Sequence, residues 1–337
     1  MQTGIFGFSS SGKTELFRAL SSEQPTARER ALVKVPEPRL QPLAQLYNPA
    51  RITPAEIEFL DLPGPGDAGQ GLGQRVLNAI RPCECILAIL DCFSGMRDPE
   101  QQIEDIAADL IVSDLAVAEK RLERLQLDKK KGRGLDQPGE EERLQEAMTL
   151  LEQGRPLRSA PDLAGAKELK GFCFLSAKPI LFVWNMREDK LDSEKPPEFT
   201  GTAQGHVQVS ARLERELAEL ESEEDRQEFL QDLGLKKSAL GRIISASYQL
   251  LGLITFLTAG PKEVRAWTIP RGISALEAAG VIHSDLAKGF IRAEVLSWQD
   301  FLVCGNFKQA KEKGLLRLEG KEYQVQDGDI ITFRFNV

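Results

Sequence analysis

The first half of the chain alternates short apolar runs with segments whose apolar residues recur every three or four positions. Short apolar runs that end in small or polar loops are typical of buried strands, and the segments between them are typical of amphipathic helices. The predicted strands are residues 5–6, 57–60, 86–90, 180–184 and 207–209. This alternation predicts a doubly wound α/β domain with a mostly parallel sheet, whose ligand lies beyond the carboxyl ends of the strands.

Between residues 103 and 151 the pattern changes to a longer helical repeat. Apolar residues three and four positions apart predict one long amphipathic helix over residues 103–125, and the same spacing resumes over residues 144–151. A polar segment, residues 128–142, separates the two and contains Lys129-Lys130-Lys131. The pattern favours an antiparallel helical hairpin that projects from the α/β domain, although two helices packed on the sheet fit it as well.

The last part of the chain is rich in predicted strands. Two helices are expected over residues 213–233 and 239–251, and short apolar runs then alternate with turn sequences such as Pro270-Arg271-Gly272. The runs are residues 253–257, 264–269, 290–296, 315–318, 323–325 and 330–335. We therefore expect three parts: an α/β domain formed by residues 1–102 and 171–250, an inserted hairpin over residues 103–170, and a small α+β domain over residues 251–337.

Composition narrows the class of protein. The chain has 337 residues, 42% hydrophobic and 28% charged, which is typical of a globular protein with more than one domain. It has no apolar run of about 18 residues and no signal-like start, so we expect a cytoplasmic protein without a membrane partner. The net charge of -8 argues against coating nucleic acid by bulk charge, and the five cysteines lack the spacing of a zinc site.

Residues 7–14 match the phosphate-binding sequence GxxxxGK[ST]. The match lies where the mechanism needs it, after an apolar strand and before a helical segment. In this arrangement main-chain N–H groups and the helix N-terminus face the phosphates, the Lys13 ammonium neutralises β- and γ-phosphate charge, and the Thr14 hydroxyl ligates Mg²⁺. We therefore predict a nucleoside-triphosphate site, with Lys13 as a catalytic group, formed by Ser9, Ser10, Ser11, Gly12, Lys13, Thr14 and Glu15.

A second motif, Asp61-Leu62-Pro63-Gly64, follows the next predicted strand and fits DxxG. In such a motif the carboxylate reaches Mg²⁺ through water, and the glycine N–H contacts the γ-phosphate. We therefore predict Asp61 as a metal-site residue and Gly64 as a second catalytic group. The glycine-rich residues 64–73 fit a nucleotide-dependent switch, and a plain flexible loop has the same composition.

A third motif, Asn185-Met186-Arg187-Glu188, follows the strand at residues 180–184, where nucleotide-specific NTPases read the base. In the NKxD form an aspartate pairs with guanine, whereas the longer Glu188 stands there in this chain, which argues against strict guanine selectivity. Ser210 and Ala211 follow the strand at residues 207–209 and are expected to close the base pocket. Asn185 alone also fits a turn cap, but four motifs in order at strand ends favour a nucleotide site.

The order of these motifs, the NxxE variant and the C-terminal sequence resemble the YchF subfamily of Obg-like P-loop NTPases. The likeness runs through nearly the whole chain and is dense after residue 212, including residues 253–270, 288–295 and 319–337. It implies a nucleotide domain with an inserted helical hairpin and a β-grasp-like TGS domain at the C-terminus. Members bind ATP at least as well as GTP, hydrolyse it slowly and associate with ribosomes. We therefore expect a slow ATPase or GTPase switch that uses Mg²⁺, acts with the ribosome or RNA, and is a monomer.

Position by position, the resemblance implies nucleotide contacts from residues 10–14, from Asn185 and Met186, and from residues 210–211. Met186 would contact adenine through its main chain, and Thr26 would be the switch threonine on Mg²⁺.

The chain departs from the family at two places that matter for hydrolysis. Pro65 stands where other NTPases carry a water-orienting Gln, and residues 92–99 lack the histidine that the family has in this loop. Both histidines of the chain, His206 and His283, lie elsewhere and are most simply structural. We expect hydrolysis slower than in the relatives, with a nucleotide-gated binding module of negligible hydrolysis as the alternative. A small-molecule kinase would need an arginine-bearing lid, and the base-reading Asn185 argues against it.

Basic residues in the C-terminal part could touch ribosomal RNA from one side of its sheet, although ordinary solvated charges fit them as well. They are Arg265, Lys288, Arg292, Arg317, Lys321 and Arg334.

Overall fold

The computed structural model describes residues 2–21, 29–64, 71–131, 138–191, 204–220, 222–235 and 238–336. Its contacts divide the chain into two compact units. Unit 1 comprises Met1–Val33 and Glu58–Leu250, and unit 2 comprises Lys34–Ile57 and Leu251–Val337. None of the helices in the described residues is long and apolar enough to cross a membrane.

Unit 1 is built on a six-stranded sheet in the order β2-β4-β1-β5-β6-β7. The pairs from β4 through β1, β5 and β6 to β7 are parallel. All the strands predicted from the apolar runs are present: β1 (Gln2–Gly7), β4 (Glu56–Asp61), β5 (Cys85–Asp91), β6 (Ile180–Asn185) and β7 (Gln204–Val209). The edge strand β2 (Arg30–Lys34), in which one residue is buried, was not among the predicted strands.

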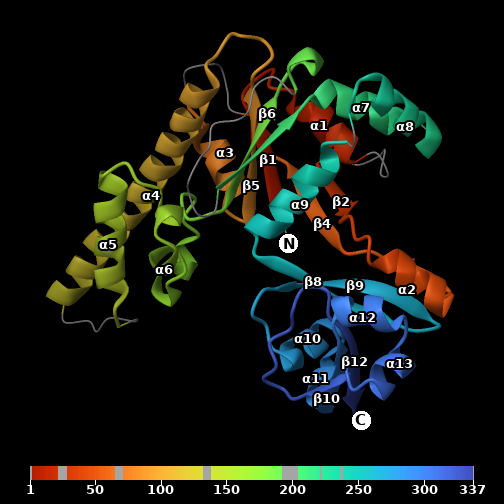
Figure 1. Ribbon diagram of the computed structural model, residues 1–337. Helices are drawn as coiled ribbons and strands as arrows, with labels where there is room; N and C mark the ends of the chain where they lie inside the picture. The colour runs from red at the N-terminus through yellow and green to blue at the C-terminus, as the bar shows by residue number, and fades with distance from the viewer. Residues whose placement is uncertain are drawn as a thin grey trace. The chain divides into compact units, whose positions relative to one another are not determined.

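Helices cover both faces of this sheet, as expected for a doubly wound fold (Figure 1). Every residue of β5 and β6 is buried, which explains why these central strands read as continuous apolar runs. On one face the sheet packs against α3 (Gly73–Ile80) and the start of α4 (Pro99–Lys130). On the other face lie α1 (Lys13–Leu20) and α9 (Leu240–Leu250). Because β1, β4, β5, β6 and β7 run parallel, the loops at their carboxyl ends gather at one edge.

The segment after β7 forms two helices where the sequence predicted one. Helix α7 (Ala211–Glu219) ends before Ser222, whose hydroxyl accepts a hydrogen bond from the Asp225 N–H at 2.9 Å. Ser222 therefore caps a new helix, α8 (Glu223–Asp232).

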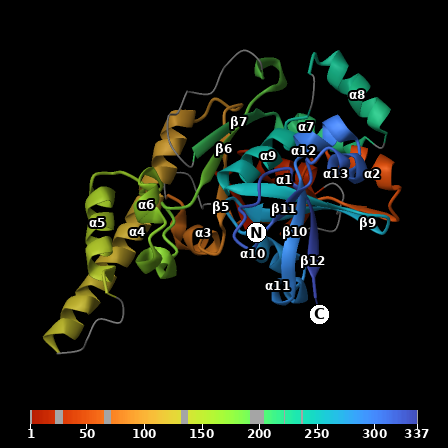
Figure 2. The same ribbon diagram turned by 60° about the horizontal axis from the view of Figure 1, so that its bottom comes forward.

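The inserted helical hairpin is present. Helix α4 spans 32 residues, and α5 (Glu140–Glu152) packs along it through an apolar seam (Figures 1 and 2). Buried Glu140 accepts two hydrogen bonds from the Arg121 guanidinium, at 2.6 and 2.9 Å, which joins the two helices. A short helical segment follows, formed by η1 (Leu157–Ser159), α6 (Pro161–Ala164) and η2 (Lys167–Phe172). The buried Asp114 carboxylate of α4 then accepts N–H groups of Leu175 and Ser176, at 2.8 and 2.7 Å, just before β6.

Unit 2 has a second six-stranded sheet, in the order β11-β10-β12-β8-β9-β3. Its apolar core lies between one face of the sheet and α10 (Ala275–Ile282). The predicted run at residues 323–325 is not a strand and contributes only an isolated bridge between Gln324 and Ser274. The strands are β3 (Arg51–Thr53), β8 (Leu253–Ala259), β9 (Glu263–Pro270), β10 (Phe290–Leu296), β11 (Arg317–Glu319) and β12 (Ile330–Phe335). The remaining helices are α2 (Leu40–Tyr47), α11 (Ser284–Lys288), α12 (Trp298–Cys304) and α13 (Phe307–Glu312).

The segment Lys34–Ile57 belongs to unit 2 by its contacts, whereas the sequence pattern had grouped it with the α/β domain. Strand β3 pairs with β9 in parallel, so that Arg51 lies opposite Glu263. The Arg39 guanidinium bonds to Glu37 and to Asp327, the latter at 2.7 Å. Pairings across more than two hundred residues leave no local signal, which is why the periodicity did not predict this grouping.

The basic residues of unit 2 do not share one face of its sheet. Arg292 lies opposite Arg334 in the β10–β12 register, on the face away from the core. By the alternation of side chains along a strand, Arg265 and Arg317 lie on the other face, which carries the core. The single six-residue RNA face considered from sequence is therefore wrong.

Candidate nucleotide site

The loop between β1 and α1 has the tight backbone that a phosphate-binding loop requires. Ser10 and Gly12 adopt left-handed conformations, with φ of 65° and 88°. The Ser11 N–H donates to the Phe8 carbonyl at 3.1 Å and closes the turn. Both glycines of the motif are needed for space, since a Cβ on Gly7 would clash with the Ser11 hydroxyl and one on Gly12 with the Asn185 amide.

The second predicted motif meets the first through Lys13. Its ammonium forms an ion pair with the Asp61 carboxylate and donates to the Leu62 carbonyl at 2.7 Å. Gly64 lies beside the start of the loop, where a Cβ would be 3.7 Å from the Gly7 carbonyl oxygen. Lys13 therefore lies together with Asp61 and Gly64, which are about fifty residues away in sequence, at the carboxyl ends of β1 and β4.

Asn185 ties three segments together with one side chain. Its Nδ2 donates to the Ser11 carbonyl at 2.7 Å, and its Oδ1 accepts the Ala211 N–H at 2.9 Å. The side chain is buried, with 5% of its residue surface exposed. A carboxamide has two N–H donors and one acceptor oxygen with two lone pairs, so one N–H remains for a ligand. Asn185 thus positions the phosphate loop and the Ser210–Ala211 turn, and it is not a simple turn cap.

Some polar groups of the other residues expected near the base already form hydrogen bonds within the protein. The Ser210 hydroxyl caps α7 by accepting the Leu213 N–H at 3.3 Å. The Met186 N–H donates to the Val209 carbonyl at 2.7 Å, and the Met186 side chain is buried in the core of unit 1. The carbonyl of Met186 is thus the main-chain group left for a base.

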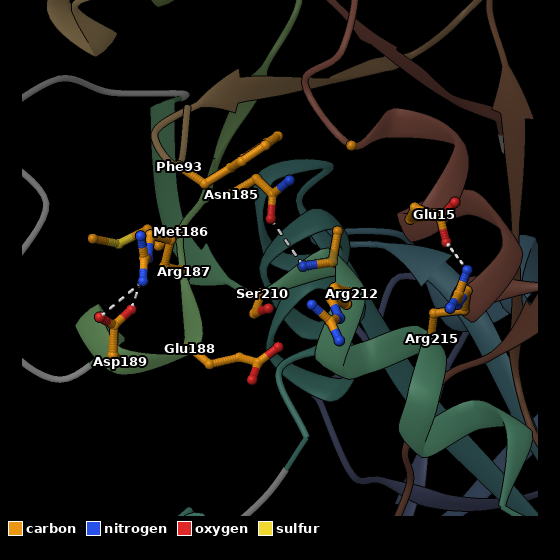
Figure 3. Close-up of a pocket in the computed structure, with 12 residues that line it drawn as sticks. Glu15, Phe93, Asn185, Met186, Arg187, Glu188, Asp189, Ser210, Arg212 and Arg215 are labelled. Carbon is orange, nitrogen blue, oxygen red and sulfur yellow. Dashed lines mark hydrogen bonds and ion pairs between the residues drawn. The ribbon is translucent and has the colours of Figure 1, made fainter. Parts of the chain in front are cut away.

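These residues line one pocket of about 770 Å³ (Figure 3). Phe93 and Asn185 stand on one side of it, Met186 and Glu188 on a second, and α7 closes it. Of the predicted site, the lining includes Gly12, Glu15, Asn185, Met186, Glu188, Ser210 and Ala211. Ser9, Ser10 and Thr14 are exposed at the loop and the first turn of α1, and Ser11 is buried beneath it.

Five lining residues were not predicted as site residues from the sequence: Phe93, Arg187, Asp189, Arg212 and Arg215. Phe93 is 38% exposed, and its aromatic ring offers a face to a purine. An aromatic residue two positions after the end of an apolar strand was the available signal. Arg212 and Arg215 lie on α7, directly after the Ser210–Ala211 turn, and only the helix geometry directs them to the pocket.

Charge is distributed in pairs around the pocket. Glu15 forms an ion pair with Arg215, at 2.9 Å, and lies 3.5 Å from the Arg18 guanidinium. The hydrogen bond to Glu216, the charge of Glu216 and the charge of Glu188 together raise the pKa of Arg212. The exposed Glu188 carboxylate extends towards Arg212 in Figure 3. Glu15 and Glu188, both expected to touch nucleotide, therefore have arginine neighbours.

The residues that fit a magnesium ion are Thr14 and Asp61. Magnesium in NTPases is held by one or two protein oxygens together with phosphates and water, so it needs no protein cage. The part of the chain that the structure describes contains no cluster of three or more His, Cys, Asp or Glu suited to a metal. Asp61 lies within reach of Lys13 at the phosphate loop, which fits this role. Thr26 and Pro65 lie outside the described residues.

Both histidines have structural roles. His206 accepts a hydrogen bond from Trp184 Nε1 at 3.0 Å, and burial lowers its pKa. His283 caps α11 by accepting the Asp285 N–H at 3.2 Å.

Known proteins are similar to this chain along its whole length. The family model described as 50S ribosome-binding GTPase matches residues 2–121, and the YchF-GTPase C-terminal model, described as a protein of unknown function, matches residues 253–336. The ribosome-binding ATPase YchF of Bacillus subtilis is 40% identical and is aligned over 100% of both chains. That of Haemophilus ducreyi is also 40% identical, over 99% of both.

The solved structure of the Schizosaccharomyces pombe YchF GTPase has a TM-score of 0.85 and 27% identity to this chain. It covers 99% of this chain, which in turn covers 97% of it. Identity of this extent along the entire length, together with the shared fold, decides the family. The chain belongs to the YchF subfamily of Obg-like P-loop NTPases.

Proposed function

We propose that this chain binds ATP with Mg²⁺, hydrolyses it slowly, and uses the bound nucleotide to control association with the ribosome. The observation that carries the proposal is that the phosphate loop, residues 185–188 and the Ser210–Ala211 turn line one pocket. The two hydrogen bonds of Asn185 hold these three segments together. Relatives of the same family, aligned over 99–100% of their length, are named ribosome-binding ATPases, which supports both the nucleotide and the partner.

The phosphates occupy the loop after β1. Main-chain N–H groups of Ser10 and of residues 12–14, together with the positive end of α1, attract phosphate oxygens, whereas the Ser11 N–H holds the turn closed. Lys13 exchanges Asp61 for the β- and γ-phosphates, since a polyphosphate offers its ammonium more negative charge than one carboxylate. Asp61 is thereby released to hold Mg²⁺ through water, beside the Thr14 hydroxyl. Gly64, next to the Gly7 carbonyl, offers its N–H to the γ-phosphate.

The base lies in the pocket between Phe93 and α7. The ring of Phe93 stacks on the purine, the remaining Asn185 N–H donates to it, and the Met186 carbonyl is available to the adenine amino group. Glu188 replaces the aspartate that selects guanine, and it is exposed and close to Arg212. We therefore propose ATP as the main ligand and GTP as a weaker one.

A second candidate function is a nucleotide sensor without meaningful hydrolysis. Both histidines are engaged in structural hydrogen bonds, and Pro65 cannot orient a water molecule. In this case ATP binding alone would change the affinity for the ribosome. Multiple-turnover phosphate release under saturating ATP separates the two, because the sensor releases at most one phosphate per chain over hours.

The nucleotide assignment is tested by calorimetric titration of ATP and GTP into the Mg²⁺-loaded protein. Lys13→Ala is expected to abolish measurable uptake, and Glu188→Asp to shift the preference towards GTP. Uptake of neither nucleotide by the wild-type chain, or unchanged uptake by Lys13→Ala, contradicts the proposal.

Ribosome association is tested by co-sedimentation with ATP, with ADP and without nucleotide. We propose that the chain acts as a monomer in the cytoplasm, where both ribosomes and ATP are present. Equal co-sedimentation under the three conditions would show that nucleotide does not control binding.

A further inference from the structure

The loop between β5 and α4 has a backbone fixed by the side chain of Asp91. This buried carboxylate accepts the N–H groups of Phe93 and Ser94, at 3.3 and 3.0 Å, and the Ser94 hydroxyl. The main chain of Asp91 is held in turn by the Gln102 amide, through two hydrogen bonds of 3.0 Å. The loop therefore leaves the sheet in one defined direction.

Arg97 lies where this loop enters α4. Before it, the Met96 N–H donates to the Ser94 hydroxyl at 3.1 Å. After it, Asp98 is the extended N-cap residue of α4 and Pro99 occupies the first turn. The backbone of Arg97 is thus constrained on both sides, which reduces the backbone entropy lost when this residue is ordered on a ligand.

The Arg97 guanidinium lies against the phosphate loop. Its Cζ is 4.6 Å from the centroid of the Phe8 ring, a cation–π contact with the second residue of the loop. Asp98, Asp105 and Asp109 line the same pocket of about 790 Å³. Within the described residues, no ion pair joins Arg97 to any of these three carboxylates.

In the proposed site the nucleotide extends from the base pocket to the phosphate loop near Gly7. The base end is marked by Phe93 and Asn185, and the opposite end by Gly64, which lies beside the Gly7 carbonyl. Phe8 directly follows Gly7, so the Arg97 guanidinium above the Phe8 ring contacts the phosphate loop next to the residue that Gly64 approaches.

We propose that Arg97 is a catalytic residue that contacts the γ-phosphoryl oxygens in the transition state, as an arginine finger supplied by the chain itself. The inference rests on the proposed ATPase function and adds to it a residue that acts on the γ-phosphoryl group. Negative charge spreads over the γ-phosphoryl oxygens as the reaction proceeds, and a planar guanidinium stabilises it through two parallel N–H bonds.

In the step itself a water oxygen forms a bond to the γ-phosphorus, and the bond to the bridging oxygen breaks with its electron pair passing to ADP. The water proton is transferred to the released phosphate. Arg97 remains protonated throughout and acts only by hydrogen bonding and charge.

The test compares Arg97→Ala and Arg97→Lys with the wild type. Arg97→Ala is expected to lower the single-turnover rate of ATP hydrolysis by roughly 10²–10³-fold, while the Kd for Mg²⁺-ATP changes less than about threefold. Arg97→Lys keeps the charge but not the planar fork, so it is expected to recover less than about a tenth of the rate. Arg124→Ala is the matched control, because Arg124 lies on α4 with a side chain 75% exposed.

A second readout separates transition-state contact from a structural role. Aluminium fluoride added with ADP imitates the transferring phosphoryl group, and it is expected to tighten ADP binding in the wild type and in Arg124→Ala but not in Arg97→Ala. If Arg97→Ala hydrolyses ATP at the wild-type rate, the role of Arg97 is refuted while the proposed function stands. The same holds if its rate falls only in proportion to a loss of ATP affinity. A wild-type chain that takes up no ATP overturns the proposed function itself.

Discussion

The replacement Asn185→Ala tests the central link of the site, because it removes one side chain that holds two segments. It deletes the hydrogen bonds to the Ser11 carbonyl, 2.7 Å, and from the Ala211 N–H, 2.9 Å. Both partner residues are 1% exposed, so each polar group loses its only observed side-chain partner in a buried place. A buried polar group left without a partner costs about 1–3 kcal/mol.

The pocket beside Asn185 admits water, so we take about 1–2 kcal/mol for each group and about 2–4 kcal/mol for the pair. For a domain of about 150–250 residues, one kcal/mol shifts the midpoint of thermal unfolding by roughly 2–4 °C. The transition of unit 1 in Asn185→Ala is therefore expected roughly 4–16 °C below that of the wild type. ATP affinity is expected to fall tenfold or more, since re-ordering the phosphate loop at a cost of about 1.4 kcal/mol already gives that factor.

The assay is differential scanning calorimetry with and without Mg²⁺-ATP, combined with titration of ATP. Asn185→Asp keeps an acceptor for the Ala211 N–H but sets a carboxylate oxygen against the Ser11 carbonyl, so it is expected to bind ATP no better than the alanine variant. Asn78→Ala is the control, because exposed Asn78 accepts only from Gln74 on the same helix, at 2.9 Å. An Asn185→Ala chain that melts within about 1 °C of the wild type and binds ATP equally well would refute the reasoning.

Two further predictions concern the scaffold of unit 1. Burial lowers the pKa of His206, so the fold favours its neutral form; this stabilisation is present above the ordinary value of 6.5 and is lost as the pH falls through the lowered pKa. Protonation of His206 also removes the acceptor for the Trp184 N–H. The thermal midpoint of the wild type should therefore fall more steeply between pH 7 and 5 than that of His206→Gln. Parallel pH profiles of the two proteins would contradict this prediction. In the hairpin, Arg121→Ala leaves the Glu140 carboxylate, 4% exposed, without its partner and should cost about 3 kcal/mol, more than Glu140→Gln. Hydrogen exchange of the α5 amides measures the stability of the hairpin in both variants. Faster exchange in Glu140→Gln than in Arg121→Ala would contradict the prediction.

The sequence alone determined the elements and the order of the motifs. Buried parallel strands have continuous apolar runs, and all those predicted for unit 1 are present. The hairpin followed from helical spacing, since the apolar seam of α4 and α5 repeats every three or four residues. The phosphate loop was predictable for a similar reason, because its glycines, Lys13 and Thr14 act through geometry confined to a few consecutive residues.

Only the tertiary structure decided how these elements pack and which distant residues form hydrogen bonds and contacts. The sequence indicated Asn185 as a base reader, and only the structure shows that it also supports the phosphate loop through its bond to Ser11, 174 residues away. The segment Lys34–Ile57 joined unit 2 through β3 and β9, and Arg97 reached the ring of Phe8. Periodicity and motif spacing report the preferences of neighbouring residues, whereas contacts between distant residues depend on how strands and helices pack. The sequence therefore predicted the motif residues of this site, but it did not predict the hydrogen bonds and contacts that join them.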